Sequence, residues 1–320
     1  MEMLEMYDRD RERAVAAFGR GLHIDSVYDD LTREGKRWIA ADGKAHEERR
    51  KLVVATFVLE VVERLAPGES GGTINRLIVW ARQFLIDQKV PSRLEITWHL
   101  ALIGLLEYHP VGGDALGVEM EYVRDRYPAD PAFNLPWGFL AVQNDLPRGI
   151  ANLDLVDMKS RDHPWDTWNA DYLTRAETYY QKALADPATS AEARVRIAEF
   201  RLRRGSPDGA LDVLKPADGE SHDPAIRYLS ALLQGWAFEA KTDDENATRS
   251  FRKALAFIPN AYAAAVGLAA ELTVAGSRDE AGDVMQEALL HPVADPWLSH
   301  LYPDYRRYPD LMAKLRTELK

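Results

Sequence analysis

A glycine-rich stretch, Gly68 to Gly72, carries the arrangement in this sequence that comes closest to a catalytic motif. It reads Gly-Glu-Ser-Gly-Gly, which fits the G-x-S-x-G pattern of a serine nucleophile. That chemistry needs a strand before the serine and a helix after it. The preceding residues Leu52 to Leu65 have helical periodicity instead. We therefore expect Ser70 in a turn between helices, with an anion site at a helix N-terminus as the second interpretation and serine catalysis as the third.

Histidine and carboxylate spacing predicts no metal centre. His46 and Glu47 begin like the zinc motif H-E-x-x-H, but no second histidine follows at the required spacing. Asp162, His163 and Asp166 could approach a cation, although a solvated loop is the favoured interpretation. The chain has no cysteine, which excludes disulfides, thiolate metal sites and thiol catalysis. We expect no catalytic residue, no cofactor and no metal.

The charge of the chain limits its partners. A formal net charge of −11 argues against nucleic-acid binding, because neutralising phosphates requires a basic surface. The longest uncharged stretch, Ala254 to Ala270, is interrupted by Pro259, so no transmembrane segment is expected. Met1 to Phe18 has the pattern of a charged amphipathic helix and not of a signal peptide. We expect a soluble protein that is cytoplasmic or, if a signal peptide was removed, exported or periplasmic.

A period of 34 residues runs through the second half of the chain. One pattern of small and large side chains recurs in four segments, with an allowance for a longer loop after the second. The matching residues are Ala176, Tyr180, Ala183 and Leu184; Ala210, Leu214 and Ala217; Ala247, Phe251, Ala254 and Leu255; and Ala281, Met285, Ala288 and Leu289. A fixed period of this length predicts a helical solenoid, in which stacked units supply the core.

These segments resemble the tetratricopeptide repeat (TPR) family, most clearly over residues 167–295. Tyr228 to Ala261 fits best, and it matches the pattern of the family at Gly235, Phe238, Ala247, Phe251, Ala254 and Pro259. The resemblance implies an all-α fold, a right-handed solenoid of antiparallel helix hairpins. In such hairpins small residues let two helix backbones approach closely, and an aromatic side chain fills the gap between them.

Weaker matches extend in both directions, over Thr97 to Asp130, Ala191 to Pro224 and Tyr262 to Asp295. We interpret Asp130 to Asp145 as the first helix of a further hairpin whose second helix is Thr167 to Ala185. The insert between them, about 146–166, is longer than a hairpin turn requires. Its apolar residues argue against full disorder, so we expect it to fill part of the groove of the solenoid. A lid that grips a partner is the functional alternative.

The sequence predicts three regions. Residues 1–90 are an N-terminal helical region without a registered repeat, residues 91–295 are the solenoid with its insert, and residues 296–320 are a C-terminal capping segment. The final segment ends in an amphipathic helix with Leu311, Met312, Leu315 and Leu319 on one side. The helices expected before the solenoid and at its start are Leu4 to Phe18, Ser26 to Ala40, Glu47 to Leu65, Thr73 to Lys89 and Ser92 to Tyr108.

The resemblance also implies a binding groove, because the first helix of each hairpin lines the concave face of such solenoids. The residues carried over to that face are mostly apolar. They are Trp98, Leu105, Tyr108, Leu135, Phe139, Val195, Glu199, Leu202, Leu232, Trp236, Glu239 and Val266. An apolar face of this size needs cover from a partner helix, from the insert or from a second copy of the chain. Trp236 and Phe139 are the expected anchors, with burial in the core as the alternative.

We therefore expect a non-catalytic scaffold that binds a protein or peptide segment along an apolar concave groove. One alternative is a structural subunit of a larger assembly in which a neighbour fills the groove permanently. A serine hydrolase-like enzyme is the less favoured alternative. The sequence indicates neither nucleic acid nor a cofactor as a partner, and it leaves a homo-oligomer open.

Overall fold

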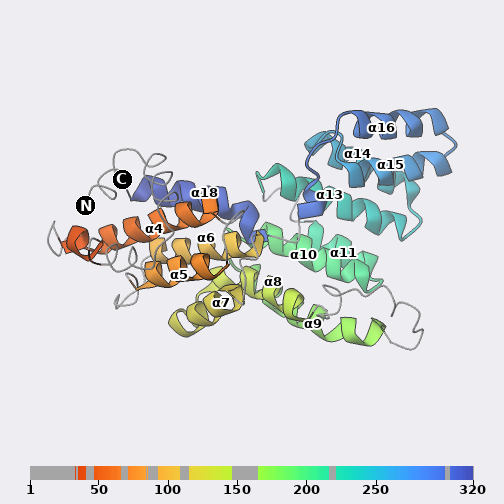
Figure 1. Ribbon diagram of the computed structural model, residues 1–320. Helices are drawn as coiled ribbons and strands as arrows, with labels where there is room; N and C mark the ends of the chain where they lie inside the picture. The colour runs from red at the N-terminus through yellow and green to blue at the C-terminus, as the bar shows by residue number, and fades with distance from the viewer. Residues whose placement is uncertain are drawn as a thin grey trace, which may run out of the picture. The chain divides into compact units, whose positions relative to one another are not determined.

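The computed structural model describes residues 33, 35–40, 47–65, 71–83, 85, 93–108, 115–145, 165–215, 221–299 and 303–319. Within these ranges every regular element is a helix, and no strand occurs (Figure 1). The expected all-α class is therefore confirmed. The expected helix 4–18, residues 26–32 of the next one and residues 146–164 of the insert lie outside the described residues.

The chain divides into two compact units, one of residues 1–128 with 304–320 and the other of residues 129–303. The sequence placed a boundary near residue 90, but the chain does not divide there. Residues 94–106, expected to begin the solenoid, share a hydrophobic core with residues 52–85. None of the helices in the described ranges combines the length and the apolar composition needed to cross a membrane.

Four helices of the first unit follow one another in the chain: α4 (Glu47–Leu65), α5 (Gly71–Arg82), α6 (Arg93–Tyr108) and α7 (Ala115–Arg126). α4 packs against α5 and α6, and α6 packs against α7. The range of α4 is the one expected from its apolar periodicity. Phe57, Leu77 and Trp98 are buried where these helices meet, so this part of the chain has a core of its own.

The C-terminal helix α18 (Pro303–Glu318) belongs mainly to this first unit. Tyr308, Met312 and Leu315 are buried in the same core as α4. Tyr308 Oη donates to a carboxylate oxygen of Glu63 at 2.9 Å, and Arg316 Nε donates to Glu60 at 2.8 Å. The final helix is amphipathic as expected, and its apolar side is buried in the core of the first unit.

Nine helices and one short 3-10 turn of the described residues make up the second unit. In chain order they are the turn η2 (Pro131–Phe133), α8 (Asn134–Asp145), α9 (Trp165–Ala183), α10 (Ser190–Arg203), α11 (Pro207–Leu214), α13 (Pro224–Glu239), α14 (Asp244–Phe257), α15 (Tyr262–Val274), α16 (Arg278–Leu290) and α17 (Pro296–Ser299). The closest pairs are α8 with α9, α10 with α11, α13 with α14 and α15 with α16. The expected pairing of helix 130–145 with helix 167–185 across the insert is therefore confirmed.

Glycines opposite aromatic rings set how closely these helices approach. A methyl group added at Gly235 of α13 would overlap the ring of Phe251 in α14. One added at Gly267 of α15 would lie 2.6 Å from Cε1 of the same ring. Gly138 of α8 faces Tyr180 of α9 in the same way. Since Phe251 is completely buried, one ring fills the space where α13, α14 and α15 meet.

Turn chemistry marks the ends of these helices. Asp223 accepts a hydrogen bond from the backbone N–H of Ala225 at 2.8 Å, and Pro224 opens α13. Gly205 and Gly276 follow α10 and α15 with φ of 70° and 83°, a left-handed conformation that glycine adopts without strain. Short turns of this kind let consecutive helices fold back on each other.

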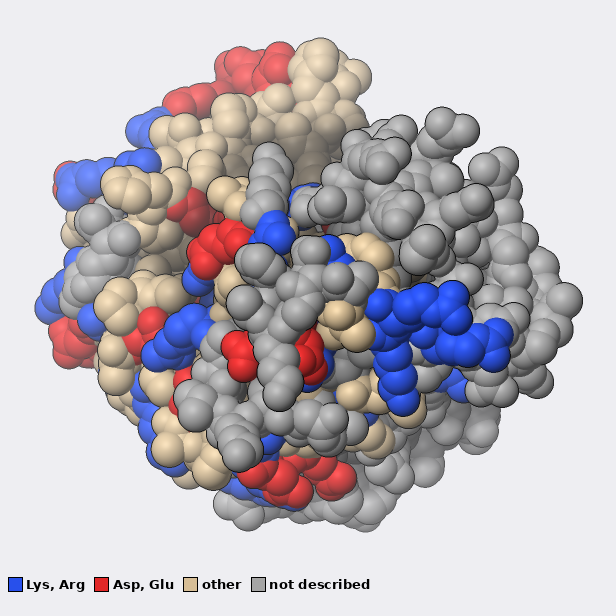
Figure 2. Space-filling view, turned by 90° about the vertical axis from the view of Figure 1, so that its left-hand side faces the viewer, with Lys and Arg blue, Asp and Glu red and all other residues tan. Residues whose placement is uncertain are grey.

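Charged side chains of both signs lie beside each other on the face of the molecule that carries α4 and α18 (Figure 2). Lys51 pairs with Glu47 at 2.9 Å one turn apart on α4, and Arg316 of α18 pairs with Glu60 of α4. Neither pair is fully exposed, because the side chain of Lys51 is 17% exposed and that of Glu60 is 8% exposed.

The glycine contacts lead to a paired test of packing. We expect Gly235→Ala to lower the free energy of unfolding by about 1–3 kcal/mol, because the new methyl group displaces Phe251 from a filled core. Gly282→Ala in α16 is the control, since nothing lies within 4 Å of its added methyl group. The control should gain about 0.5–1 kcal/mol from better helix propensity. Equal gains for both variants in urea unfolding would refute the close approach at Gly235.

Candidate functional site

Most of the residues predicted to line one groove are buried. Seven of the twelve are buried: Trp98, Leu105, Leu135, Phe139, Val195, Glu199 and Leu232. Leu202 and Trp236 are half-buried, Glu239 and Val266 are exposed, and the side chain of Tyr108 lies outside the described residues. Trp98 and Leu105 belong to the first unit and the others to the second. Most of these side chains are therefore core residues of their own unit, and a partner groove along them stays a prediction.

The sequence does not show which of these positions are buried, because the first helices of the hairpins are apolar throughout. Positions that line an open face and positions that contact the next hairpin are both apolar here, and periodicity alone cannot separate them. Phe139, an expected anchor, is only 4% exposed. Glu199 is buried as well, and its carboxylate pairs with Arg203 at 2.5 Å along the same helix. Burial was the alternative considered for the anchors, and it holds for Phe139.

Trp236, the other expected anchor, is covered by a segment of the same chain. The short helix α17 packs on α13, and the ring of Trp297 meets that of Trp236 edge to face, with centroids 4.7 Å apart. Asp295 fixes this segment, because its carboxylate accepts hydrogen bonds from Ala263 N at 2.7 Å and from Trp297 N at 2.8 Å. Burial and the charge of Asp295 also raise the pKa of Tyr228. Residues 295–297 thus cover the part of α13 that carries Trp236.

One apolar face in the second unit stays open. Tyr262, Val266, Ala270 and Val274 recur every four residues along α15 and form what we name the α15 stripe. Tyr262 is 51% exposed, Val266 42% and Val274 75%. The residues one repeat earlier, Tyr228 and Leu232, are completely buried. The same face of the repeat is therefore covered on α13 and uncovered on α15.

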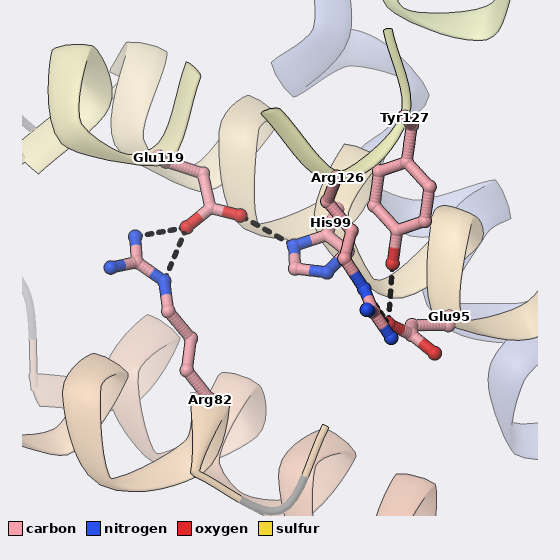
Figure 3. A network of polar contacts seen from close by, with 6 residues as sticks. All are labelled: Arg82, Glu95, His99, Glu119, Arg126 and Tyr127. Atoms are coloured by element: carbon pink, nitrogen blue, oxygen red, sulfur yellow. Dashed lines mark hydrogen bonds and ion pairs between the residues drawn. The ribbon is translucent and has the colours of Figure 1, made fainter. Parts of the chain in front are cut away.

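The densest cluster of interacting charged and aromatic side chains lies elsewhere, inside the first unit (Figure 3). Arg82, at the end of α5, donates through Nε to Glu119 Oε2 at 2.7 Å, and its Nη2 donates to the same oxygen. His99 Nδ1 of α6 lies 2.5 Å from the other oxygen of Glu119. An ionised carboxylate only accepts, so Nδ1 carries the hydrogen. Glu119 of α7 thus joins three helices.

A second carboxylate extends this cluster. Tyr127 donates through its hydroxyl to Glu95 Oε1, and Arg126 Nε lies 3.8 Å from the same oxygen. The rings of Tyr122 and Tyr127 have their centroids 5.3 and 5.5 Å from that of His99. Burial, followed by the hydrogen bond to Glu95, raises the pKa of Tyr127 above its ordinary range. The phenol therefore remains a donor throughout the physiological range.

The charges of the cluster compensate one another. Burial alone would raise the pKa of Glu119, but His99 and Arg82 outweigh it, so that the pKa lies below its usual value. A histidine oriented by a carboxylate is an arrangement that activates nucleophiles in hydrolases. Here His99 and Glu119 are both 0% exposed, and a substrate cannot reach them. The cluster therefore fixes how α5, α6 and α7 pack.

Sequence reasoning missed this cluster. His99 stands in the apolar run Ile96 to Leu106, and a histidine in such a run is a signal of a buried polar contact. Its partner Glu119 lies 20 residues further along, on another helix. No local pattern joins the two residues. No site can be described at the other residues that the sequence singled out. Ser70, His46, Asp162 and His163 lie outside the described residues, and Asp166 is the one member of its trio that the structure includes.

Comparison with known proteins adds no family. No family model matches the sequence, and no curated protein matches it. In the described part of the chain, no group of three or more His, Asp or Glu side chains is placed to hold a metal ion. The α15 stripe and the buried cluster are therefore judged on their own geometry.

Removing the central carboxylate tests the buried cluster. We expect Glu119→Gln to lower the free energy of unfolding by about 3–5 kcal/mol, because Arg82 stays buried without a counter-charge. The matched control is Glu245→Gln, which breaks an exposed ion pair with Arg249 and should leave the unfolding midpoint unchanged. Urea unfolding followed by tryptophan fluorescence measures both. A loss no larger than that of the control would show that the cluster adds nothing to stability.

Because the pKa of Glu119 is lowered, the contribution of this carboxylate to the free energy of unfolding depends on pH. A carboxylate whose pKa is lower in the folded than in the unfolded chain stabilises the fold above its unfolded value, here 4.5, and less as the pH falls below it. The difference in unfolding free energy between wild type and Glu119→Gln should therefore be constant near neutral pH. It should shrink as the pH falls from about 5 to 3. A difference independent of pH over that range contradicts an ionised Glu119.

Proposed function

We propose that this protein is a non-catalytic interaction scaffold with a tetratricopeptide-like solenoid, and that it binds a protein or peptide segment along the α15 stripe. The solenoid is supported by the pairing of consecutive helices in the second unit. It is also supported by the contact of Gly235 with the ring of Phe251, two positions that the resemblance picks out. Stacked hairpins of this kind present one face of each first helix to the solvent or to a partner.

The observation that carries the proposal is the exposure of the α15 stripe. α15 has one charged residue, Glu271, among mostly apolar ones, and a helix of that composition is normally buried on most sides. The terminal unit of a repeat array instead needs a polar outer face to stay soluble. α15 follows neither rule, because its apolar side chains are exposed to solvent. The simplest explanation of this exposure is that another molecule covers the helix.

The buried cluster supports a non-catalytic role for the first unit. Its arginine, histidine and carboxylate side chains contact one another, and its central histidine and carboxylate are closed to solvent. We assign it to holding the N-terminal helices together. The alternative is a structural subunit with a permanently filled groove. In that alternative a neighbouring subunit covers α15 permanently, whereas in the proposal a partner covers it only while bound.

Crosslinking from the stripe tests the proposal. A photo-crosslinking amino acid replaces Ala270, and the protein is irradiated in lysate of the source cells with and without Val266→Asp. We expect a discrete crosslinked protein whose yield falls at least about tenfold with Val266→Asp, because a buried carboxylate at an apolar contact costs more than the lost contact.

The matched control is Val79→Asp, which alters another exposed valine, 62% exposed on α5 of the first unit. It should leave the yield unchanged. Circular dichroism confirms that both variants fold. The absence of any discrete crosslink, or an equal loss in both variants, refutes the α15 stripe as a binding face.

A further inference from the structure

Two carboxylates lie in a place where their own chain does not neutralise them. Glu239 is the last residue of α13 and is exposed, while Glu271 lies in the last turn of α15 and is 5% exposed. Neither side chain has a hydrogen bond or an ion pair with another described residue. Burial raises the pKa of Glu271, and the carboxylates of Asp244 and Glu239 raise it further. The Glu271 side chain is packed against its neighbours, but its carboxylate oxygens are not closed to solvent, so that a cation from another molecule can reach them.

The helix ends make this position more negative still. The C-terminal end of a helix carries about half a negative charge, and basic side chains usually lie there. Neither α13 nor α15 has a basic residue in its last turn. Asp244 is different, because it opens α14, where the positive end of the helix dipole suits it. The uncompensated charge therefore centres on Glu239 and Glu271.

This charge lies beside the α15 stripe. Glu271 is the immediate neighbour of Ala270 and precedes Val274 by three residues, less than one turn. α13, which ends at Glu239, packs against α15. One edge of the stripe is therefore acidic, while the stripe itself is apolar and about 18 Å long, the rise of 12 residues of helix.

The charge of the hairpin formed by α15 and α16 argues against a second copy of this chain as the molecule that binds the α15 stripe. Residues 262–293 carry five carboxylates and one guanidinium, that of Arg278. Two such hairpins face to face would place like charges against each other in a partly desolvated contact. An oppositely charged segment gains from the same field.

From these observations we propose that the α15 stripe binds a basic amphipathic helix, whose apolar side chains cover Tyr262, Val266 and Val274 and whose Lys or Arg side chains reach Glu239 and Glu271. This inference rests on the proposed function and specifies the chemistry of the partner. An amphipathic helix laid in a groove recognises its site through apolar residues spaced three and four apart, which fits the spacing of the stripe. The charges select the partner and orient it.

Three model peptides of 18 residues test the proposal by fluorescence anisotropy. The first is an amphipathic helix of leucine and lysine, the second has glutamate in place of lysine, and the third has the composition of the first in a scrambled order. We expect the first to bind, more weakly as salt is added, and the other two not to bind. Val266→Asp should abolish the binding of the first peptide.

The charge contribution is measured with the double variant Glu239→Gln and Glu271→Gln, which should weaken the binding of the first peptide about tenfold. The control removes the same charge from exposed positions of α16, through Asp283→Asn and Glu287→Gln, and should change the affinity less than about twofold. Glutamine keeps the shape of the buried Glu271 side chain, and thermal unfolding checks that the fold is intact.

Failure of this inference can be distinguished from failure of the proposed function. If the acidic peptide binds as tightly as the basic one and both need Val266, the face binds helices without selecting for charge, and the inference is overturned alone. The inference is also overturned if no peptide binds while crosslinking from Ala270 still captures a partner. Equal effects of the two double variants would show that Glu239 and Glu271 take no special part.

Discussion

The close approach of helices around one buried ring is the constraint on which the second unit depends. Phe251 of α14 lies against Gly235 of α13 and Gly267 of α15, so that three helices meet without a gap. Only glycine, which has no Cβ, lets a helix backbone lie this close to the ring. Because the ring fixes α15 against α13, it also determines which side of α15 turns away from the core. The exposure of the α15 stripe is thus a consequence of packing at Phe251.

The features that the sequence predicted well are those with a local cause. Helix ranges such as Glu47–Leu65 follow from apolar periodicity, and the aromatic positions Tyr180 and Phe251 follow from the 34-residue period. These signals lie within one or two turns, or at a fixed spacing, and a single sequence contains them. The pairing of α8 with α9 across the insert was predictable for the same reason.

The features that were missed depend on contacts between distant residues. Tyr308 bonds to Glu63, which lies 245 residues away, and nothing local to α18 says that its apolar side faces the N-terminal unit. His99 and Glu119 meet for a similar reason. In the candidate site, the exposed Val266 and the buried Leu232 are both apolar and occupy equivalent repeat positions. Only the presence of a covering neighbour separates them, and that neighbour is set by the fold.

The central claim is that the α15 stripe is open in the free protein and covered in the complex, and hydroxyl-radical footprinting tests it most directly. In the purified protein Tyr262 should be oxidised readily, whereas its repeat equivalent Tyr228, which is completely buried, should be protected. With the crosslinked partner present, Tyr262 should become protected while Leu290, 62% exposed on α16, keeps its reactivity. A Tyr262 that is already protected in the free protein, or that reacts equally with and without the partner, would contradict the account.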